Sequence, residues 1–340
     1  MEVSIQEMVK NPIHEIPTCY LVDQEARISY PSSVAEIPVL DMKSLLDEEN
    51  KISQLQKLHS TCSEWGIFQL VNHGVDISLM EKLKSEINEF YKLPLEEKLK
   101  YKIKQGDVEG YGQTVIVSDD QKVDWADRFY IITNPIQRRK PHLFPKLPSY
   151  LRETLEAYIA ELQKLSRAIF MLIAEALMIE EREVEEMFVD GMQSMRMTYY
   201  PPCPEPEKVI GLTPHSDASG ITVLLQLNGV EGFQVNKDGL WIPVKFLPNA
   251  FVVNIGDIVE ILSNGVYKSI EHRATVNSER ERMTIALFFS CKYEAEVGPS
   301  PSLLMKQQPL FRRLKMDQYV KDFFSRKLNG KSFLQYMKIN

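Results

Sequence analysis

Two histidines and one aspartate have the types and spacing of a metal site. His215 and Asp217 flank Ser216, and His272 follows far downstream. In an extended strand alternate side chains project to the same side, so His215 and Asp217 can grip one ion while Ser216 turns away. The segment 269–276 has the β-branched content of a strand, which predicts that a second strand delivers His272. Two imidazoles and one carboxylate are the ligands that hold ferrous iron on one face and leave the opposite face open.

Further motifs along nearly the whole chain together resemble a known family. They are IPVLD (37–41), WGIFQLVNHG (65–74), YYPPC (199–203), GLTPHSD (211–217), NIGD (254–257) and EHR (271–273). On these motifs the chain resembles the plant-type 2-oxoglutarate and Fe(II)-dependent dioxygenases. Within that family it is most similar to the alkaloid-demethylating branch that includes codeine and thebaine O-demethylases.

The resemblance implies an activity and a set of cofactors. His215, Asp217 and His272 would hold Fe(II), and 2-oxoglutarate and O2 would take the remaining positions on the metal. The expected reaction is hydroxylation or O-demethylation of a small aromatic or alkaloid-like plant specialised metabolite through a ferryl intermediate, with release of succinate and CO2. No side chain beyond the metal centre is needed for catalysis, and a stimulatory role for ascorbate stays open.

Three further residues are expected to hold 2-oxoglutarate. Its distal carboxylate needs a cation of fixed charge with forked donors, which Arg282 supplies better than a lysine could. Thr284 would present a hydroxyl from the same strand face, and by similarity Tyr200 would donate its phenol. Thr198 stands where the family usually has asparagine, and Thr284 where it usually has serine. Neither change removes a metal ligand, so we expect activity to survive.

The organic substrate is expected to lie against side chains that share the inward phase of Arg282. Phe288 keeps that period of two, and its ring could stack on a flat molecule. Trp125 and Phe129 are predicted to belong to the core instead, because aromatic side chains fill cores more often than pockets. The candidate pocket residues are Tyr111, Gln113, Phe288 and Ser290.

The hydrophobic periodicity predicts a mainly β fold with flanking α-helices. Helical periods occupy 55–64, 79–91 and 148–179, and β-rich runs occupy 221–227, 233–235, 240–244, 251–255, 258–262 and 283–289. The resemblance makes the core a double-stranded β-helix, or jelly roll. We expect one integrated unit with a mixed α/β region (1–190), the jelly-roll core (191–300) and a helical end (301–340). The late cluster Phe333, Leu334, Tyr336 and Met337 is either a lid or a docked amphipathic helix.

Bulk properties restrict the partners. The 340 residues are 44% hydrophobic with a formal charge of −7, which gives no electrostatic reason to bind nucleic acid or an anionic membrane. The start of the chain lacks a targeting pattern, so we expect a cytoplasmic monomer acting on a small molecule. Alternatives stay open: an iron-dependent oxidase that does not use 2-oxoglutarate, a catalytically silent small-molecule-binding jelly roll, or a site for another divalent metal such as zinc.

Overall fold

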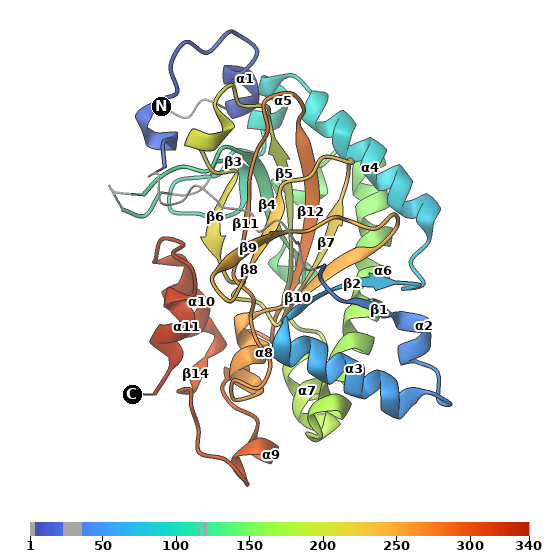
Figure 1. Ribbon diagram of the computed structural model, residues 1–340. Helices are drawn as coiled ribbons and strands as arrows, with labels where there is room; N and C mark the ends of the chain where they lie inside the picture. Colours follow the sequence, from blue (N-terminus) through green and yellow to red (C-terminus); the bar gives the residue numbers. More distant parts are fainter. Residues whose placement is uncertain (1–3, 23–35, 114–115, 119–120, 340) are drawn as a thin grey trace.

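Two β-sheets form the centre of the molecule (Figure 1). The computed structural model describes residues 4–22, 36–113, 116–118 and 121–339. All neighbouring strands within the two sheets run antiparallel except β1 and β2, which are parallel. In spatial order, the eight-stranded sheet contains β1 (Val39–Asp41), β2 (Ile67–Val71), β10 (Phe251–Ile255), β7 (Ile221–Gln226), β12 (Arg282–Phe289), β5 (Gln193–Tyr200), β4 (Asp127–Asn134) and β3 (Gly110–Gly112). The four-stranded sheet contains β6 (Leu212–His215), β11 (His272–Ala274), β8 (Phe233–Lys237) and β9 (Leu240–Pro243).

The two sheets pack face to face through an apolar layer. Leu224, Val252 and Ala286 of the large sheet belong to the same buried cluster as Phe233 and Val235 of the small sheet. Packed antiparallel sheets of this kind are the architecture of a jelly roll. The sheets therefore confirm the predicted mainly β core, and they enclose the space in which a site can form.

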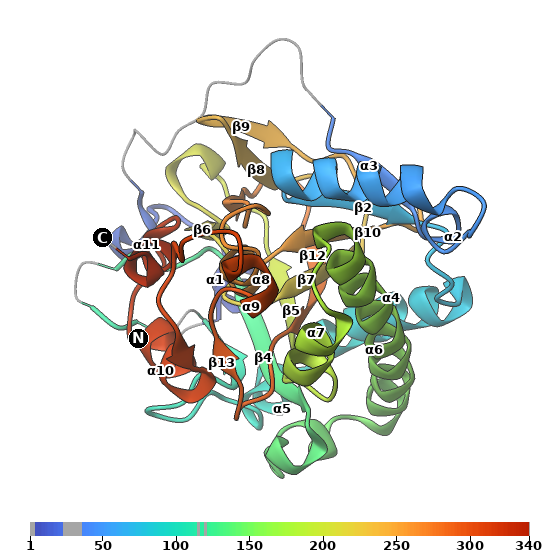
Figure 2. The ribbon, with the colours of Figure 1, turned by 90° about the horizontal axis from the view of Figure 1, so that it is seen from below.

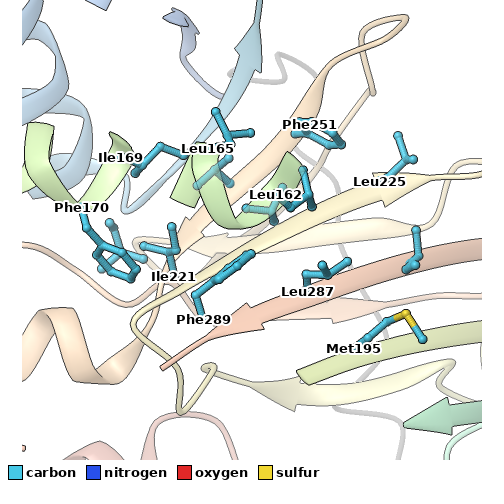
Figure 3. Packing of buried hydrophobic residues seen from close by; sticks show 14 of the residues in the cluster. Leu162, Leu165, Ile169, Phe170, Met195, Ile221, Leu225, Phe251, Leu287 and Phe289 are labelled. Carbon is cyan, nitrogen blue, oxygen red and sulfur yellow. The ribbon is translucent and has the colours of Figure 1, made fainter. Parts of the chain in front are cut away.

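Helices cover the other face of the large sheet. In Figures 1 and 2, α3 (Lys51–Glu64), α4 (Ile77–Lys92) and α6 (Ser149–Leu177) lie together on one side of the molecule. Figure 3 shows Leu162, Leu165 and Ile169 of α6 above side chains of the strands, Ile221 and Phe289 among them. Because the helices cover one face of β10 and the small sheet covers the other, every residue of β10 is buried. The predicted helices at 55–64, 79–91 and 148–179 are confirmed.

One predicted strand is wrong. Residues 258–262 lie in the helix α8 (Asp257–Leu262) and not in a strand. All six residues of α8 are buried, and Glu260 is the one polar residue within 258–262, so this segment shows no amphipathic pattern of a surface helix. A short apolar run fits a buried strand and a buried helix equally well. Gly256 precedes α8, and the chain leaves β10 at that point.

The C-terminal segment returns to the small sheet. Its elements are β13 (Glu296–Val297), α9 (Pro301–Leu304), β14 (Leu314–Lys315), α10 (Met316–Phe324) and α11 (Ser332–Met337), with α10 and α11 on the side opposite α4 and α6 (Figures 1 and 2). Gly330 N donates to Pro214 O at 2.9 Å, and Ser216 N donates to Gly330 O at 3.3 Å. These bonds attach the segment beside His215.

Short helices complete the described structure. They are α1 (Ile5–Met8), α2 (Met42–Leu45), α5 (Leu95–Leu99) and α7 (Glu181–Phe188), with 3₁₀ turns at Thr18–Tyr20, Ile136–Arg138, Phe144–Lys146 and Pro206–Lys208. Within the described part of the chain, none of the helices combines the length and the apolar character that crossing a bilayer requires.

Candidate active site

The two histidines lie opposite each other on neighbouring strands of the small sheet. His272 in β11 is paired in register with His215 in β6, and their ring centroids are 4.4 Å apart. Asp217 Oδ1 lies 3.4 Å from His215 Nε2 and 3.8 Å from His272 Nε2. One ligand atom from each of the three residues lies within 4.8 Å of the others, and no other such cluster occurs among the described residues. The sequence analysis placed His215 and Asp217 on one strand. In the structure β6 ends at His215, and Asp217 lies beyond it.

Backbone carbonyls orient both imidazoles. His215 Nδ1 lies 2.8 Å from Thr213 O, and His272 Nδ1 lies 3.2 Å from Ile270 O. A carbonyl can only accept, so each Nδ1 carries a proton, and in the neutral ring Nε2 is then the nitrogen with the lone pair. His215 Nε2 is buried without a hydrogen-bond partner. Burial lowers the pKa of His272 to about 4, which keeps the ring neutral near pH 7. Metal-ligating histidines typically have this arrangement.

Two side chains fix the carboxylate of Asp217. Its Oδ2 accepts from Thr222 Oγ1 at 2.6 Å and from Asn254 Nδ2 at 2.9 Å, while Oδ1 faces the imidazoles. Burial alone would raise the pKa of Asp217, but the imidazoles of His272 and His215 and the Thr222 hydroxyl outweigh it and hold that pKa below its usual value. Asp217 is therefore ionised and presents one free oxygen. Together the triad suits a divalent cation that prefers nitrogen and oxygen ligands.

The guanidinium group of Arg282 lines a small cavity beside the triad. Tyr200 and Arg282 are paired in register on β5 and β12, and both line this cavity with Thr284 and His272. Arg282 is 2% exposed, yet its Nε and Nη2 have no hydrogen-bond partner. Burial lowers the pKa of Arg282. A buried guanidinium with two unpaired donors fits a small carboxylate anion, because leaving a buried charge unpaired is costly.

Thr198 occupies the inward face of β5 next to this cavity. It is buried and paired in register with Thr284. The residue that replaces the family's usual asparagine therefore lies among the residues predicted to hold the cosubstrate.

A larger cavity of about 320 Å³ also borders the triad. His215 and Asp217 line it, so a molecule in this cavity lies next to the metal ligands. Phe288 and Ser290 line it too, which agrees with the inward phase predicted for the strand that carries Arg282. Trp125 and Phe129 are fully buried in the core, as predicted.

Tyr111 and Gln113 lie elsewhere. Tyr111 is paired in register with Phe129, and both rings pack near Phe90 in the core. Gln113 Nε2 donates to Tyr20 Oη at 2.9 Å. Neither residue lines the larger cavity. Side chains alternate between the two faces of a strand, and Tyr111 is on the face that points into the core, away from the cavity.

The cavity wall also contains residues that the sequence analysis did not single out. Arg128 and Tyr130 of β4 and Arg196 of β5 line it together with the C-terminal residues Met316, Tyr319, Val320, Phe323, Phe324, Arg326 and Leu328. The late cluster, predicted as either a lid or a docked amphipathic helix, has Phe333, Leu334 and Met337 buried in the main core, with Phe333 packed against Tyr319 and Phe323. For Arg196 a signal exists in the sequence, since it shares the period-two phase of Tyr200.

Comparison with known proteins agrees with this geometry. Family profiles described as "2OG-Fe(II) oxygenase superfamily" and "non-haem dioxygenase in morphine synthesis N-terminal" match residues 191–290 and 37–147. Codeine O-demethylase from Papaver somniferum is 50% identical, over 99% of this chain and 96% of its own. Oxoglutarate-dependent flavonoid 7-O-demethylase 1 from Ocimum basilicum is 47% identical, over 99% and 91%. The crystal structure of JOX2 in complex with 2OG, Fe and JA superposes with a TM-score of 0.89 at 34% identity, over 99% of this chain and 98% of that one.

Proposed function

The chain belongs to the 2OG-Fe(II) oxygenase superfamily, and on that premise we propose that it hydroxylates or O-demethylates a small aromatic plant metabolite at the His215, Asp217 and His272 centre. One observation carries the proposal. The triad borders two cavities: a small one with an unpaired buried guanidinium, and a larger one that can take an organic molecule.

Each metal ligand contributes one atom. His215 Nε2, His272 Nε2 and Asp217 Oδ1 would hold Fe(II), and the Thr222 and Asn254 hydrogen bonds to Asp217 Oδ2 would keep that carboxylate monodentate. Bound Fe(II) with 2-oxoglutarate activates dioxygen for attack on a C–H bond, and the cosubstrate leaves as succinate and CO2. The side chains themselves bind, orient and exclude water.

The small cavity would receive 2-oxoglutarate. Arg282 would donate from Nε and Nη2 to the distal carboxylate, and the Thr284 hydroxyl and Tyr200 phenol would add neutral donors. Because Arg282 is buried, its charge is poorly screened and its geometry is fixed by packing. Arg282 and the metal ligands Asp217 and His272 line the same cavity, so together they would set the orientation of the cosubstrate.

The larger cavity would receive the organic substrate. Phe288 and Tyr130 bring rings to its wall, which suits a flat molecule. Oxidation of a methyl group on oxygen would give a hemiacetal that breaks into an alcohol or phenol and formaldehyde. Oxidation of another carbon would leave the hydroxyl in the product. The demethylase names of two relatives support the first outcome.

Metabolite profiling tests the proposal. The protein, Fe(II), 2-oxoglutarate and a plant extract are incubated in air, and His215→Ala is compared with His14→Ala, which removes an exposed imidazole. We expect products one oxygen heavier or one CH2 lighter with the wild type and with His14→Ala, and none with His215→Ala. Products of equal yield from His215→Ala would refute the metal role.

Labelled carbon dioxide separates the nearest alternative. A member of the fold that oxidises its substrate without 2-oxoglutarate would convert substrate without releasing CO2 from the cosubstrate. The unpaired donors of Arg282 favour the 2-oxoglutarate-dependent reaction. If ferrous protein consumed no oxygen with any substrate, a catalytically silent binding protein would be the better description. The formal charge of −7 gives no electrostatic attraction to nucleic acid or to an anionic membrane. A cytoplasmic monomer remains our proposal, which light scattering and fractionation can check.

A further inference from the structure

Two arginines project from adjacent strands into the larger cavity. On β4, Arg128, Tyr130 and Ile132 line the cavity, whereas the alternate residues, Asp127 and Phe129 among them, are buried on the other face. Tyr130 is paired in register with Arg196 of β5, so Arg128 and Arg196 are diagonal neighbours on one face of the sheet. Diagonal positions of an antiparallel pair are about 7–8 Å apart, which long side chains can bridge.

Neither guanidinium forms an ion pair within the part of the chain that the structure describes. Arg128 Nε donates to Gln113 O at 3.2 Å, and the Arg196 guanidinium lies 5.4 Å from the centre of the Phe288 ring. Asp124 attracts Arg128, but its Oδ1 accepts from Thr213 N at 2.8 Å and from Thr213 Oγ1 at 2.7 Å.

Burial and mutual repulsion both act on Arg128. Burial, followed by the positive charge of Arg196, lowers the pKa of Arg128 to about 10. Two like charges held close in a partly dry cavity are unfavourable unless an anion lies between them. Among the described residues, the two guanidinium groups therefore lie close together without a paired carboxylate.

The rest of the described cavity wall offers no anion for a cationic substrate. Asp217 is the one carboxylate among the described lining residues, and its free oxygen faces the imidazoles of the metal site. Two further arginines line the cavity. Arg138 lies 3.6 Å from the Tyr293 ring centre, and Arg326 lies 4.2 Å from that of Tyr336. The cavity is thus lined by aromatic rings and positive charge.

We propose that Arg128 and Arg196 form an anion subsite, and that the organic substrate is a flat aromatic compound carrying a carboxylate rather than a protonated amine. The inference rests on the proposed function, because it specifies the substrate of that site. The carboxylate would lie between the two guanidinium groups, and the ring would lie against Phe288 and Tyr130. Among aromatic and alkaloid-like small molecules, this selects the acidic aromatic ones.

Isothermal titration of matched ligands tests the subsite. The panel consists of flat methoxylated aromatic acids, 4-methoxycinnamate among them, each with its primary amide and the corresponding amine. The protein is used anaerobically, both metal-free and loaded with Fe(II) and 2-oxoglutarate. We expect at least one acid to bind tenfold or more tighter than its amide, and the amines to bind more weakly than the amides. If no acid in the panel binds better than its amide, absence of binding included, the proposal is overturned.

Substitutions locate the effect. Arg128→Gln and Arg196→Gln should each weaken binding of the preferred acid by roughly ten- to a hundredfold, because each removes a charge-assisted hydrogen bond. Binding of the amide should change by less than about threefold on the same reasoning. Arg182→Gln removes one positive charge from the exposed face of α7, and it should leave binding of the acid unchanged. An equal loss in Arg182→Gln, or no loss in Arg128→Gln, overturns the proposal.

Titration with 2-oxoglutarate separates the subsite from the cosubstrate site. Arg196 also lines the small cavity, whereas Arg128 lines only the larger one. Both glutamine variants should keep the affinity of the wild type for 2-oxoglutarate within about twofold if the arginines serve the organic substrate. A strong loss of 2-oxoglutarate affinity in Arg196→Gln would assign that residue to the cosubstrate and overturn the paired subsite. Conversely, normal preference for acids without any 2-oxoglutarate turnover would contradict the proposed function and leave the subsite intact.

Discussion

The hydrogen bond from Thr222 to Asp217 should control metal affinity. Thr222→Val keeps the shape of the side chain and removes the hydroxyl that donates to Asp217 Oδ2 at 2.6 Å. The same hydroxyl has Ser219 Oγ 3.1 Å away, and because it donates its single proton to Asp217, it accepts from Ser219. The substitution therefore breaks a buried chain of two bonds and leaves only Asn254 to orient the carboxylate. Loss of such an outer partner weakens metal binding by about 10- to 100-fold, or about 1.4–2.7 kcal/mol.

A matched variant distinguishes orientation from general destabilisation. Thr133→Val removes a fully buried hydroxyl on β4 that donates to Gln193 O at 3.1 Å, and Thr133 lines neither cavity. Each variant should lose about 1 kcal/mol of folding stability, measured by urea unfolding of the metal-free protein. Only Thr222→Val should weaken Mn(II) binding, measured anaerobically by electron paramagnetic resonance. Wild-type Mn(II) affinity in Thr222→Val, or an equal loss in Thr133→Val, would refute the reasoning.

Three further changes have distinct expected results. Arg282→Lys keeps the charge but loses the forked donors, so the KM for 2-oxoglutarate should rise at least about tenfold in a succinate assay, while Arg280→Lys on the exposed loop should match the wild type. Phe288→Ala removes a ring from the larger cavity, so calorimetry should show flat aromatic ligands binding at least about tenfold more weakly, and retained wild-type affinity would contradict that role. Deletion of residues 329–340 removes three buried side chains of α11, each worth about 2–5 kcal/mol, so the melting temperature should fall sharply; an unchanged melting curve would show that α11 is not part of the core.

The sequence predicted well the elements whose pattern of apolar and polar residues follows which of their faces is buried. β12 is eight residues long, and Arg282, Thr284 and Phe288 share one phase, so the inward side could be identified from a single arginine. The helix α6 carries an apolar stripe along its length, and its bounds differ from the prediction by one or two residues. In α8 every residue is buried, Asp257 and Glu260 included, so the alternation of buried and exposed positions that identifies a surface helix is absent.

Contacts between distant segments could not be predicted in the same way. Asp217 has left the strand, and its position depends on Thr222, on Asn254 and on the backbone bond from Asp257 N to Asp217 O at 2.7 Å. The alternation of side chains along a strand predicted that His215 and Asp217 would lie together, but only His215 is in the strand. The ligand set was nevertheless recognisable, because the residue types limit the chemistry more strongly than the backbone path does.

Arg128 shows why the substrate side of the cavity was harder to identify. On β4 the two faces read Asp127 and Phe129 against Arg128 and Tyr130, and each face pairs one charge with one ring. Hydrophobic alternation cannot tell them apart, because both sides of the strand are covered. The charges differ in how they are satisfied: Asp127 accepts from Ser4 Oγ, Ile5 N and Gln6 N, whereas no carboxylate among the described residues pairs with Arg128. In a sheet covered on both faces, the charge that the protein leaves unpaired marks the side where a ligand supplies its partner.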